Sequence, residues 1–440
     1  MSCRVIVQAS SLKNKDSFMK NIDTLCIHSG YEPQSGEPKV LPIAQSTVFE
    51  YEDVDKLARL FDLEDEGHMY SRISNPTVAA FEKKMASLEG GVGAVATSAG
   101  QSATLNAILT ICNAGEHVLS MQNLYGGTYT LFSSTLKKMG IDVSFVDPNA
   151  PGSAIAAAIQ NNTKLIFGET IGNPGLDVLD IERVANVAHK NGLPLMLDNT
   201  FPTPYLCRPF QFGADIVIHS TTKYLDGHAT SIGGVIIDSG NFDWEKSGRH
   251  PHLTDPDPSY HGLSYTKKFG RAAFAIKARV VFVRDIGNIM APFNAFLTNL
   301  GTETLALRME RHSFNALKTA EYLENHSKIS WVNYPGLKSS RSYALSQKYL
   351  PRGASGVISF GVEGGVEAGK KFINSLKLVS LLVHVGDVRS MVLHPASMTH
   401  RQLSPEQQLA AGVRPDMVRL SVGIENVDDI IEDLDQALIA

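Results

Sequence analysis

The chain has 440 residues, of which 43% are hydrophobic and 19% charged, with a formal net charge of −5 at pH 7. This composition is that of a globular protein, and the length exceeds what one hydrophobic core usually serves, so we expect two or three domains. Because lysine and arginine are dispersed, the sequence argues against a nucleic-acid-binding surface.

The four cysteines, Cys3, Cys26, Cys112 and Cys207, are scattered and form no CxxC pair. We therefore expect neither a disulfide framework nor a metal site, and the cytoplasm is the expected compartment. No apolar run approaches the ~18 residues that indicate a membrane span, and the first residues lack a signal-peptide core. Residues 1–20 are expected to be a disordered lead-in.

Short apolar runs alternate with amphipathic stretches of helical length between residues 76 and 240. The first helix is predicted to begin at Asn75-Pro76, since asparagine caps a helix and proline suits its first turn, and to end at Gly90-Gly91. Strands are predicted at 94–97, 118–120, 143–146, 165–167, 195–197 and 216–218, with a helix over 101–109. This alternation predicts a largely parallel α/β sheet.

A polar segment rich in Pro, His, Asp and Gly interrupts this pattern at 239–270, where we expect an insertion loop. A long helical stretch is predicted to begin near Gly287. The remaining chain mixes helices with short strands, such as 356–360, and ends in a helix around 428–439. These patterns predict a large domain over 76–286 and a smaller α+β domain over 287–440.

Two segments have the character of phosphate-binding turns. Ser98-Ala99-Gly100-Gln101-Ser102 lies between a predicted strand and a predicted helix, where free backbone N–H groups favour an anion. The hydroxyls of Ser220 and Thr222 alternate in an extended chain, so both can bind one phosphate. The first segment alone is a weak signal, because many strand–helix turns look like it.

Two ionisable residues follow predicted strands. Lys223 comes directly after the hydroxyl pair, and an amine there can form a Schiff base with pyridoxal phosphate if burial beside positive charge lowers its pKa. Asp198 ends the strand over 195–197, where a carboxylate points into the ligand crevice and can keep a pyridine nitrogen protonated. The alternatives are a surface lysine and an aspartate that caps a turn.

Three further motifs contain residues that can contact a ligand. Tyr125 precedes two glycines, which would let its ring lie flat against a planar group. Tyr70 and Arg72 share a face of an extended chain and offer a hydroxyl and a guanidinium to a phosphate. Arg419 interrupts an otherwise apolar strand and should have a counter-anion, either a substrate carboxylate or a structural salt-bridge partner. For Tyr125 the commoner explanation is a tyrosine packed in a turn. For Tyr70 and Arg72 it is a polar loop before a helix.

Taken together and in order, these motifs resemble the pyridoxal-phosphate (PLP) enzymes of cysteine and methionine metabolism, the cystathionine γ-synthase-like family. The resemblance extends from about Thr24 to the C-terminus and rests on Tyr70-Ser71-Arg72 with Asn75-Pro76-Thr77, Asp198-Asn199-Thr200, Ser220-Thr221-Thr222-Lys223-Tyr224 and His394-Pro395-Ala396-Ser397-Met398-Thr399-His400. It implies the aspartate-aminotransferase-like (type I PLP) fold, with a mostly parallel seven-stranded sheet, helices on both faces and a smaller C-terminal α+β domain.

By position, the resemblance also implies how the cofactor is held. Lys223 would be the Schiff-base lysine and proton shuttle, Asp198 would pair with the ring nitrogen, and Tyr125 would stack on the ring and could assist proton transfer. The phosphate would be held by Gly100, Gln101, Ser220 and Thr222.

The remaining site residues concern the substrate and the neighbouring subunit. Arg419, helped by Asn173, would bind the substrate α-carboxylate. His384 departs from the family, which commonly has serine or asparagine there, and we expect it on the substrate side. Tyr70 and Arg72 would complete the phosphate site of a neighbouring subunit. Residues 1–75 would then form an arm that reaches this subunit, in a tetramer built as a dimer of dimers.

Within the family, the segments 60–67 and 239–270 resemble the branch that acts on O-acetyl-L-homoserine. Glu303 stands where the lyases and cystathionine synthases usually have lysine, and Gly127 stands where methionine γ-lyase has a cysteine. The implied reaction is γ-replacement with sulfide or a small thiol, which gives homocysteine or methionine plus acetate. The alternatives are a γ-lyase that releases 2-oxobutanoate and ammonia, an O-succinyl or O-phospho substrate, and a non-catalytic PLP carrier.

Overall fold

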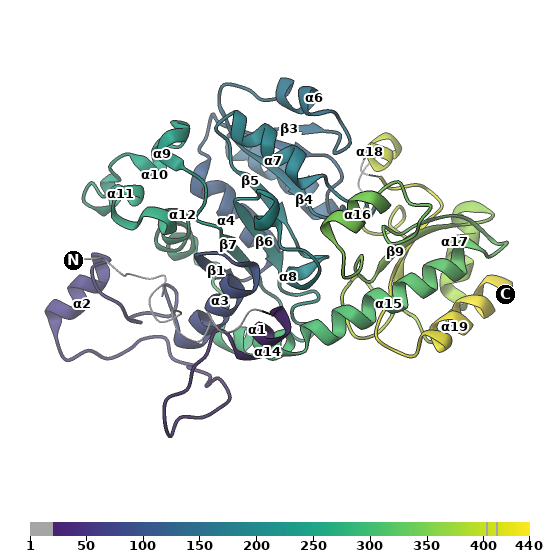
Figure 1. Cartoon of the computed structure of the whole chain (residues 1–440), viewed down its shortest axis with the longest axis horizontal. Coiled ribbons are helices and arrows are strands. Elements are labelled where there is room, and N and C mark those ends of the chain that lie inside the picture. The colour runs from purple at the N-terminus through teal and green to yellow at the C-terminus, as the bar shows by residue number, and fades with distance from the viewer. Residues whose placement is uncertain (1–20, 402–403, 411) are drawn as a thin grey trace.

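The computed structural model describes residues 21–401, 404–410 and 412–440 (Figure 1). The expected lead-in over 1–20 lies outside the described residues. A seven-stranded sheet with the order β1-β7-β6-β5-β4-β2-β3 forms the centre of the molecule, and a five-stranded sheet lies beside it.

The central sheet is mostly parallel, as predicted. Only β7 runs antiparallel to its neighbours β1 and β6. The strands are β1 (Gly93–Thr97), β2 (His117–Met121), β3 (Asp142–Val146), β4 (Thr163–Glu169), β5 (Leu195–Asp198), β6 (Ile216–Ser220) and β7 (Gly234–Asp238). Sequence reasoning missed β7, because its apolar run is short and follows glycines that indicate a turn.

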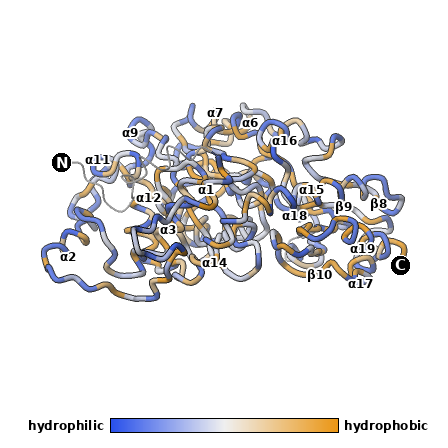
Figure 2. The backbone as a smooth tube through the Cα atoms, turned by 60° about the horizontal axis from the view of Figure 1, so that its bottom comes forward, coloured by the Kyte–Doolittle hydropathy of each residue, from blue (hydrophilic) through white to orange (hydrophobic). Residues whose placement is uncertain are grey.

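Helices cover both faces of this sheet. Leu197 and Val217 pack in one core with α3 and α7, while Met196 and Ile216 pack in the other core with α4 and α12. Since both faces are buried, the strands read as continuous apolar runs, and Figure 2 shows short hydrophobic stretches alternating with hydrophilic ones along the chain. The helices of this half are α3 (Pro76–Glu89), α4 (Gly100–Ile111), α5 (Gly126–Thr130), α6 (Gly152–Ala157), α7 (Ile181–Lys190), α8 (Thr203–Leu206) and α12 (Ala273–Lys277).

Helix α3 begins and ends where its sequence predicts. The side chain of Asn75 accepts a hydrogen bond from the backbone N–H of Thr77 at 3.0 Å, and Pro76 occupies the first turn. Gly90 follows the helix with a φ of 81°, a conformation that glycine adopts without strain.

The segment 239–270, predicted as an insertion loop, contains regular structure. It contains the short helices α9 (Trp244–Ser247), α10 (Pro251–Thr254) and α11 (Tyr265–Phe269), and its Trp244, Leu253 and Tyr265 side chains are buried in the core shared with α4. Helices of four or five residues are shorter than the window in which helical periodicity can be recognised. Helical structure also precedes Gly287, through α12 and α13 (Arg284–Ile286).

The C-terminal part is a smaller α+β unit, as predicted. Its sheet has the order β10-β11-β12-β9-β8 and is antiparallel except between β10 and β11. The strands are β8 (Ile329–Asn333), β9 (Val357–Val362), β10 (Ser380–Leu381), β11 (Met391–Leu393) and β12 (Met417–Ser421). The helices are α14 (Pro292–Glu303), α15 (Leu305–Glu324), α16 (Tyr343–Tyr349), α17 (Gly365–Ser375), α18 (Pro405–Ala410) and α19 (Val427–Ile439).

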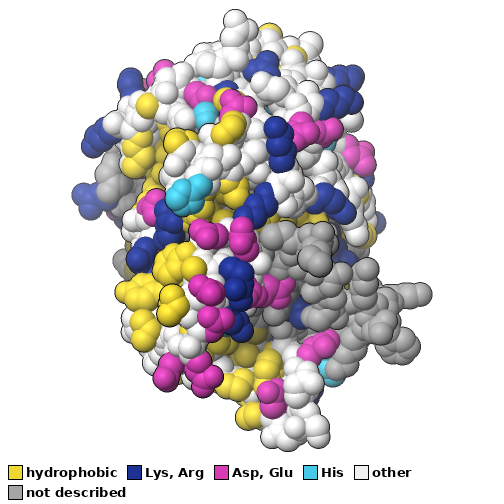
Figure 3. Space-filling model, turned by 90° about the vertical axis from the view of Figure 1, so that its left-hand side faces the viewer, with side chains coloured by type: hydrophobic (Ala, Val, Ile, Leu, Met, Phe, Trp, Pro, Cys, Tyr) yellow, Lys and Arg dark blue, Asp and Glu magenta, His cyan; other side chains and the backbone are white. Residues whose placement is uncertain are grey.

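The N-terminal segment between α1 (Ile22–His28) and α3 extends away from the body. Figure 1 shows this segment, which carries α2 (Val54–Phe61), at the left and lower edge of the molecule. Val40, Val48, Val54 and Phe61 are exposed on it, and Figure 3 shows hydrophobic side chains at the surface on this side. Across the described ranges, no helix is both long and apolar enough to cross a membrane.

Candidate active site

A cavity of about 200 Å³ lies at the carboxyl ends of β4, β5 and β6. In a parallel sheet these ends meet at one edge, which is where ligands bind in such folds. Most of the predicted site residues line this cavity: Gly100, Gln101, Tyr125, Asn173, Asp198, Ser220, Thr222, Lys223, His384 and Arg419.

Asp198 ends β5 on the cavity wall. Its Oδ1 atom accepts a hydrogen bond from the backbone N–H of Thr200 at 2.9 Å. Burial raises the pKa of this carboxyl group, and the two hydrogen bonds from Thr200 only partly oppose that effect. A cation beside Asp198 would favour its ionised form, so the residue fits a protonated ring nitrogen.

The start of α4 has the features of an anion site. Ala99 precedes the helix and cannot cap it, so its first N–H groups have no side-chain acceptor. A Cβ at Gly100 would lie 2.6 Å from the Cβ of Ser220, so only glycine allows the helix to approach the end of β6 this closely. The Thr222 hydroxyl is fixed nearby, since it donates to the carbonyl of Gly233 at 3.2 Å.

Lys223 is a half-buried lysine that faces the same cavity, and it is therefore not a surface lysine at a strand end. Burial and, to a smaller extent, the nearby Arg419 lower the pKa of Lys223 to about 8. Its Nζ lies 3.1 Å from Nδ1 of His384, whose pKa burial and Lys223 lower to about 4. The histidine is thus neutral at physiological pH and accepts the hydrogen bond that the lysine donates.

Tyr125 lies at the mouth of the cavity and is 43% exposed. A Cβ at Gly127 would lie 2.5 Å from an atom of the Tyr125 ring. The glycine is therefore required for the ring to take this position. The backbone N–H of Tyr125 donates to Oε1 of Glu169 at 2.7 Å.

Arg419 is a buried guanidinium on β12, with 5% of its surface exposed. It donates to Oδ1 of Asn173 at 3.0 Å and to the carbonyl of His384 at 3.4 Å. Within the described part of the chain no carboxylate forms an ion pair with it, so the structural salt bridge considered above is not formed there. Burial lowers the pKa of Arg419 to about 10. A buried guanidinium whose partners are an amide oxygen and a carbonyl can bind an anion that enters the cavity.

Two predicted residues do not lie in this cavity. The side chain of Arg72 donates to the carbonyl of Arg284 and lies over the ring of Tyr70, 5.3 Å from its centroid. Tyr70 is 37% exposed. A single chain therefore does not bring Tyr70 and Arg72 to its own site.

Sequence reasoning did not single out every residue that lines the cavity, and two of those it missed lie at or just after the strand ends. Glu169 ends β4 and pairs with Asp198 across the ladder. Thr200 accepts a hydrogen bond from the backbone N–H of Ser220 at 2.9 Å and so joins the ends of β5 and β6. The strand-end rule that singled out Asp198 would also have found Glu169, had the strand over 165–167 been extended by two residues.

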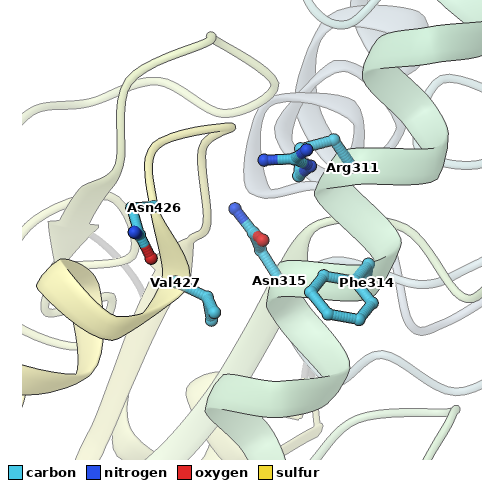
Figure 4. Close-up of a pocket in the computed structure, with 5 residues that line it drawn as sticks. All are labelled: Arg311, Phe314, Asn315, Asn426 and Val427. Atoms are coloured by element: carbon cyan, nitrogen blue, oxygen red, sulfur yellow. The ribbon is translucent and has the colours of Figure 1, made fainter.

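A second hollow lies between α15 and the start of α19. It measures about 460 Å³ and is lined by Arg311, Phe314, Asn315, Asn426 and Val427, which face one another across it in Figure 4. Arg311 is the one ionisable side chain among these five, so the hollow offers no acid–base pair for catalysis. Across the described residues, no group of three or more His, Cys, Asp or Glu side chains could hold a metal ion.

A family model for the Cys/Met metabolism PLP-dependent enzymes matches residues 23–439. The chain belongs to this family. The O-acetyl-L-homoserine sulfhydrylase of Leptospira meyeri is 50% identical over 426 residues, which cover 94% of this chain and 96% of that protein. The homocysteine synthase of Schizosaccharomyces pombe is 49% identical over 422 residues, which cover 95% of this chain and 98% of that protein.

Solved structures confirm the fold and the cofactor. A crystal structure of a putative O-acetylhomoserine (thiol)-lyase from Campylobacter jejuni, which contains N'-pyridoxyl-lysine-5'-monophosphate, has a TM-score of 0.93 at 37% identity. It covers 96% of this chain and 100% of that chain. The predicted family, enzyme class and PLP dependence are thereby confirmed. The cavity fits this cofactor, because it brings together a helix start without a side-chain cap, the amine of Lys223 and the carboxyl group of Asp198.

The lowered pKa of Lys223 predicts how the apoenzyme recombines with PLP. Only the neutral amine attacks an aldehyde, so the rate should rise with pH and level off above about 8, rather than near the ordinary lysine pKa of 10.5. The rate can be followed by visible absorbance after mixing at several pH values, with a simple alkylamine as the control. A midpoint near that of the alkylamine would contradict the prediction.

Proposed function

We propose that the enzyme catalyses γ-replacement on O-acetyl-L-homoserine, with sulfide or a small thiol as acceptor, and forms homocysteine or methionine plus acetate. The observation that carries the proposal is the similarity, over nearly the full chain, to relatives named O-acetyl-L-homoserine sulfhydrylase and homocysteine synthase. The cavity supports it, because it joins a cofactor site to a buried arginine that can bind an amino-acid carboxylate.

The proposed cofactor site uses the predicted residues in their predicted roles. The phosphate would be bound by the N–H groups of Gly100 and Gln101 with the hydroxyls of Ser220 and Thr222, and Tyr125 would lie against the ring. Asp198 would keep the ring nitrogen protonated, and Lys223 would supply the amine that holds the aldehyde. When bound, PLP supplies an electron-withdrawing ring that stabilises negative charge on the substrate α-carbon.

The substrate is oriented by residues on the other side of the cavity. Arg419, held by Asn173, binds the α-carboxylate and so fixes the α-carbon near Lys223. A lysine pKa of about 8 lets the freed amine take a proton at Cα or Cβ and return it near neutral pH. His384 accepts a hydrogen bond from the Lys223 amine and orients it. Because the pKa of His384 is much lower, the proton stays on the lysine.

The reaction is tested by comparing two assays of the purified holoenzyme. O-acetyl-L-homoserine with sulfide should give homocysteine and acetate, and methionine alone should give little 2-oxobutanoate. Replacing the acetyl ester by the succinyl or phosphate ester tests the leaving group, and methanethiol in place of sulfide tests the acceptor. Rapid release of 2-oxobutanoate and ammonia from methionine would instead identify a γ-lyase, and inactivity in every assay would favour a carrier.

The active unit is proposed to contain at least two chains, arranged as a dimer of dimers in the cytoplasm. In this arrangement the arm over 1–75 brings Tyr70 and Arg72 to the phosphate site of a neighbouring subunit, while the chain divides into domains over 76–286 and 287–440. Two observations support it: neither residue lines its own cavity, and the segment that carries them extends from the body with exposed hydrophobic side chains.

Complementation between two inactive variants tests this sharing of residues. If Arg72 acts in the neighbouring site, a hybrid of Lys223→Ala and Arg72→Ala chains contains one intact site and one doubly defective site. Co-expression in equal amounts should then restore about one quarter of wild-type activity, since about half of the pairs are hybrids. Differently tagged chains allow the hybrid to be purified and assayed. If Arg72 served its own chain, no hybrid would regain activity.

A further inference from the structure

Glu169 is a buried carboxyl group on the cavity wall, with 5% of its surface exposed. It accepts two backbone hydrogen bonds: Oε1 from the N–H of Tyr125 at 2.7 Å and Oε2 from the N–H of Asn173 at 3.1 Å. Burial, and then the adjacent Asp198, raise the pKa of Glu169 well above its usual range. Burying a carboxyl group beside a second carboxyl group costs free energy, which raises the question of what Glu169 contributes to the site.

The two hydrogen-bond partners of Glu169 lead to opposite sides of the cavity. Tyr125 carries the ring at the cavity mouth, in the turn that follows β2. Asn173 lies in the turn after β4, and its side-chain oxygen accepts from the buried guanidinium of Arg419 at 3.0 Å. One carboxyl group therefore connects the stacking tyrosine to the arginine that binds the carboxylate.

The turns that carry these residues also pack directly against each other. A Cβ at Gly172 would lie 2.4 Å from the side-chain nitrogen of Asn123, so no side chain fits between them. With Glu169 as their common acceptor, a displacement of one turn is transmitted to the other. An amide in place of the carboxylate would have only one oxygen for two N–H donors, and one buried donor would lose its partner.

We propose that Glu169 is a positioning residue that holds Tyr125 and the Asn173–Arg419 pair in a fixed relation, so that the affinity for the substrate carboxylate depends on it. The proposal rests on the roles proposed above for these three residues. It adds that the position of Arg419, which binds the substrate carboxylate, depends on the cofactor side of the cavity. The connection runs from Glu169 through the backbone of the turns that carry Tyr125 and Asn173.

Two small amines that differ only in the carboxylate test this proposal. L-Alanine and ethylamine are titrated into Glu169→Gln holoenzyme, and binding is followed by the change in visible absorption. The dissociation constant for L-alanine should rise about tenfold or more, and that for ethylamine less than about twofold. The visible circular dichroism of the bound cofactor should also change as Tyr125 moves. An equal rise for both amines, or no rise for L-alanine, would overturn the proposal.

Asp433→Asn provides the matched control. Asp433 is also a buried carboxyl group, 6% exposed, and it accepts backbone N–H groups from Lys377, Leu378 and Val379, but it lies on α19 away from the cavity. This variant should lose stability and keep both dissociation constants. If Glu169→Gln yields no folded holoenzyme, Glu169→Asp, which withdraws the carboxylate by one methylene, gives the same comparison. Neither titration requires turnover, so a wrong assignment of O-acetyl-L-homoserine would not affect the outcome.

Discussion

Replacing Lys223 with alanine is expected to lower kcat by about 10³-fold or more, because the variant loses both its covalent hold on the cofactor and its proton-transferring amine. Borohydride reduction followed by mass spectrometry measures the first loss directly. The wild-type chain should gain the mass of the reduced cofactor at Lys223, and the variant should not. Added methylamine should restore part of the activity, since it supplies an amine in the vacated space.

Lys277→Met is the matched control for this experiment. Lys277 is 7% exposed, and burial lowers its pKa to about 8, as for Lys223. It lies on α12 and does not line the cavity. The control should therefore keep its kcat and its covalently attached cofactor. That result would show that the loss in Lys223→Ala comes from removing the amine in the cavity and not from removing a buried lysine. Cofactor attachment that persists in Lys223→Ala would contradict the whole assignment of the site.

Residues that follow strands directly could be predicted from the sequence, because local pattern alone places them. Lys223 and Asp198 come at the ends of recognisable apolar runs, and parallel strands bring such ends to one edge. The partner of Arg419 could not be predicted in this way. Asn173 lies 246 positions away in the sequence, and His384 lies 161 positions from Lys223. Only the family resemblance suggested Asn173 and His384, since no local pattern reports a contact across two domains.

The parts of the fold that were missed have two causes. The short helices of the segment 239–270 contain too few residues for a period of 3.6 to be recognised, while the apolar run of β7 follows glycines that indicate a turn. Their place is determined by packing against the sheet and α4, which is a tertiary effect. Tyr70 and Arg72 illustrate a different limit. Their motif indicates a phosphate ligand, but one chain places them outside its own cavity.

Replacing Asp198 with asparagine is expected to lower kcat by about 10²- to 10⁴-fold, while most of the cofactor stays bound. The asparagine side chain keeps the shape of aspartate and can donate a hydrogen bond to an unprotonated ring nitrogen. It cannot stabilise the protonated nitrogen by charge, so the ring loses its electron-withdrawing power. Steady-state kinetics measure the loss, and the absorbance of cofactor released by alkali verifies occupancy.

Asp215→Asn is the control that distinguishes this charge effect from the loss of a buried carboxyl group. Asp215 is 3% exposed and accepts a hydrogen bond from the backbone N–H of Leu195 at 2.8 Å, but it precedes β6 at the edge of the sheet opposite the cavity. Its replacement should reduce thermal stability and leave kcat near the wild-type value. If Asp198→Asn kept full activity at full occupancy, the ring would not need a charged partner. The raised pKa of Asp198 would then reflect burial alone, and the electrostatic basis of the proposed reaction would be wrong.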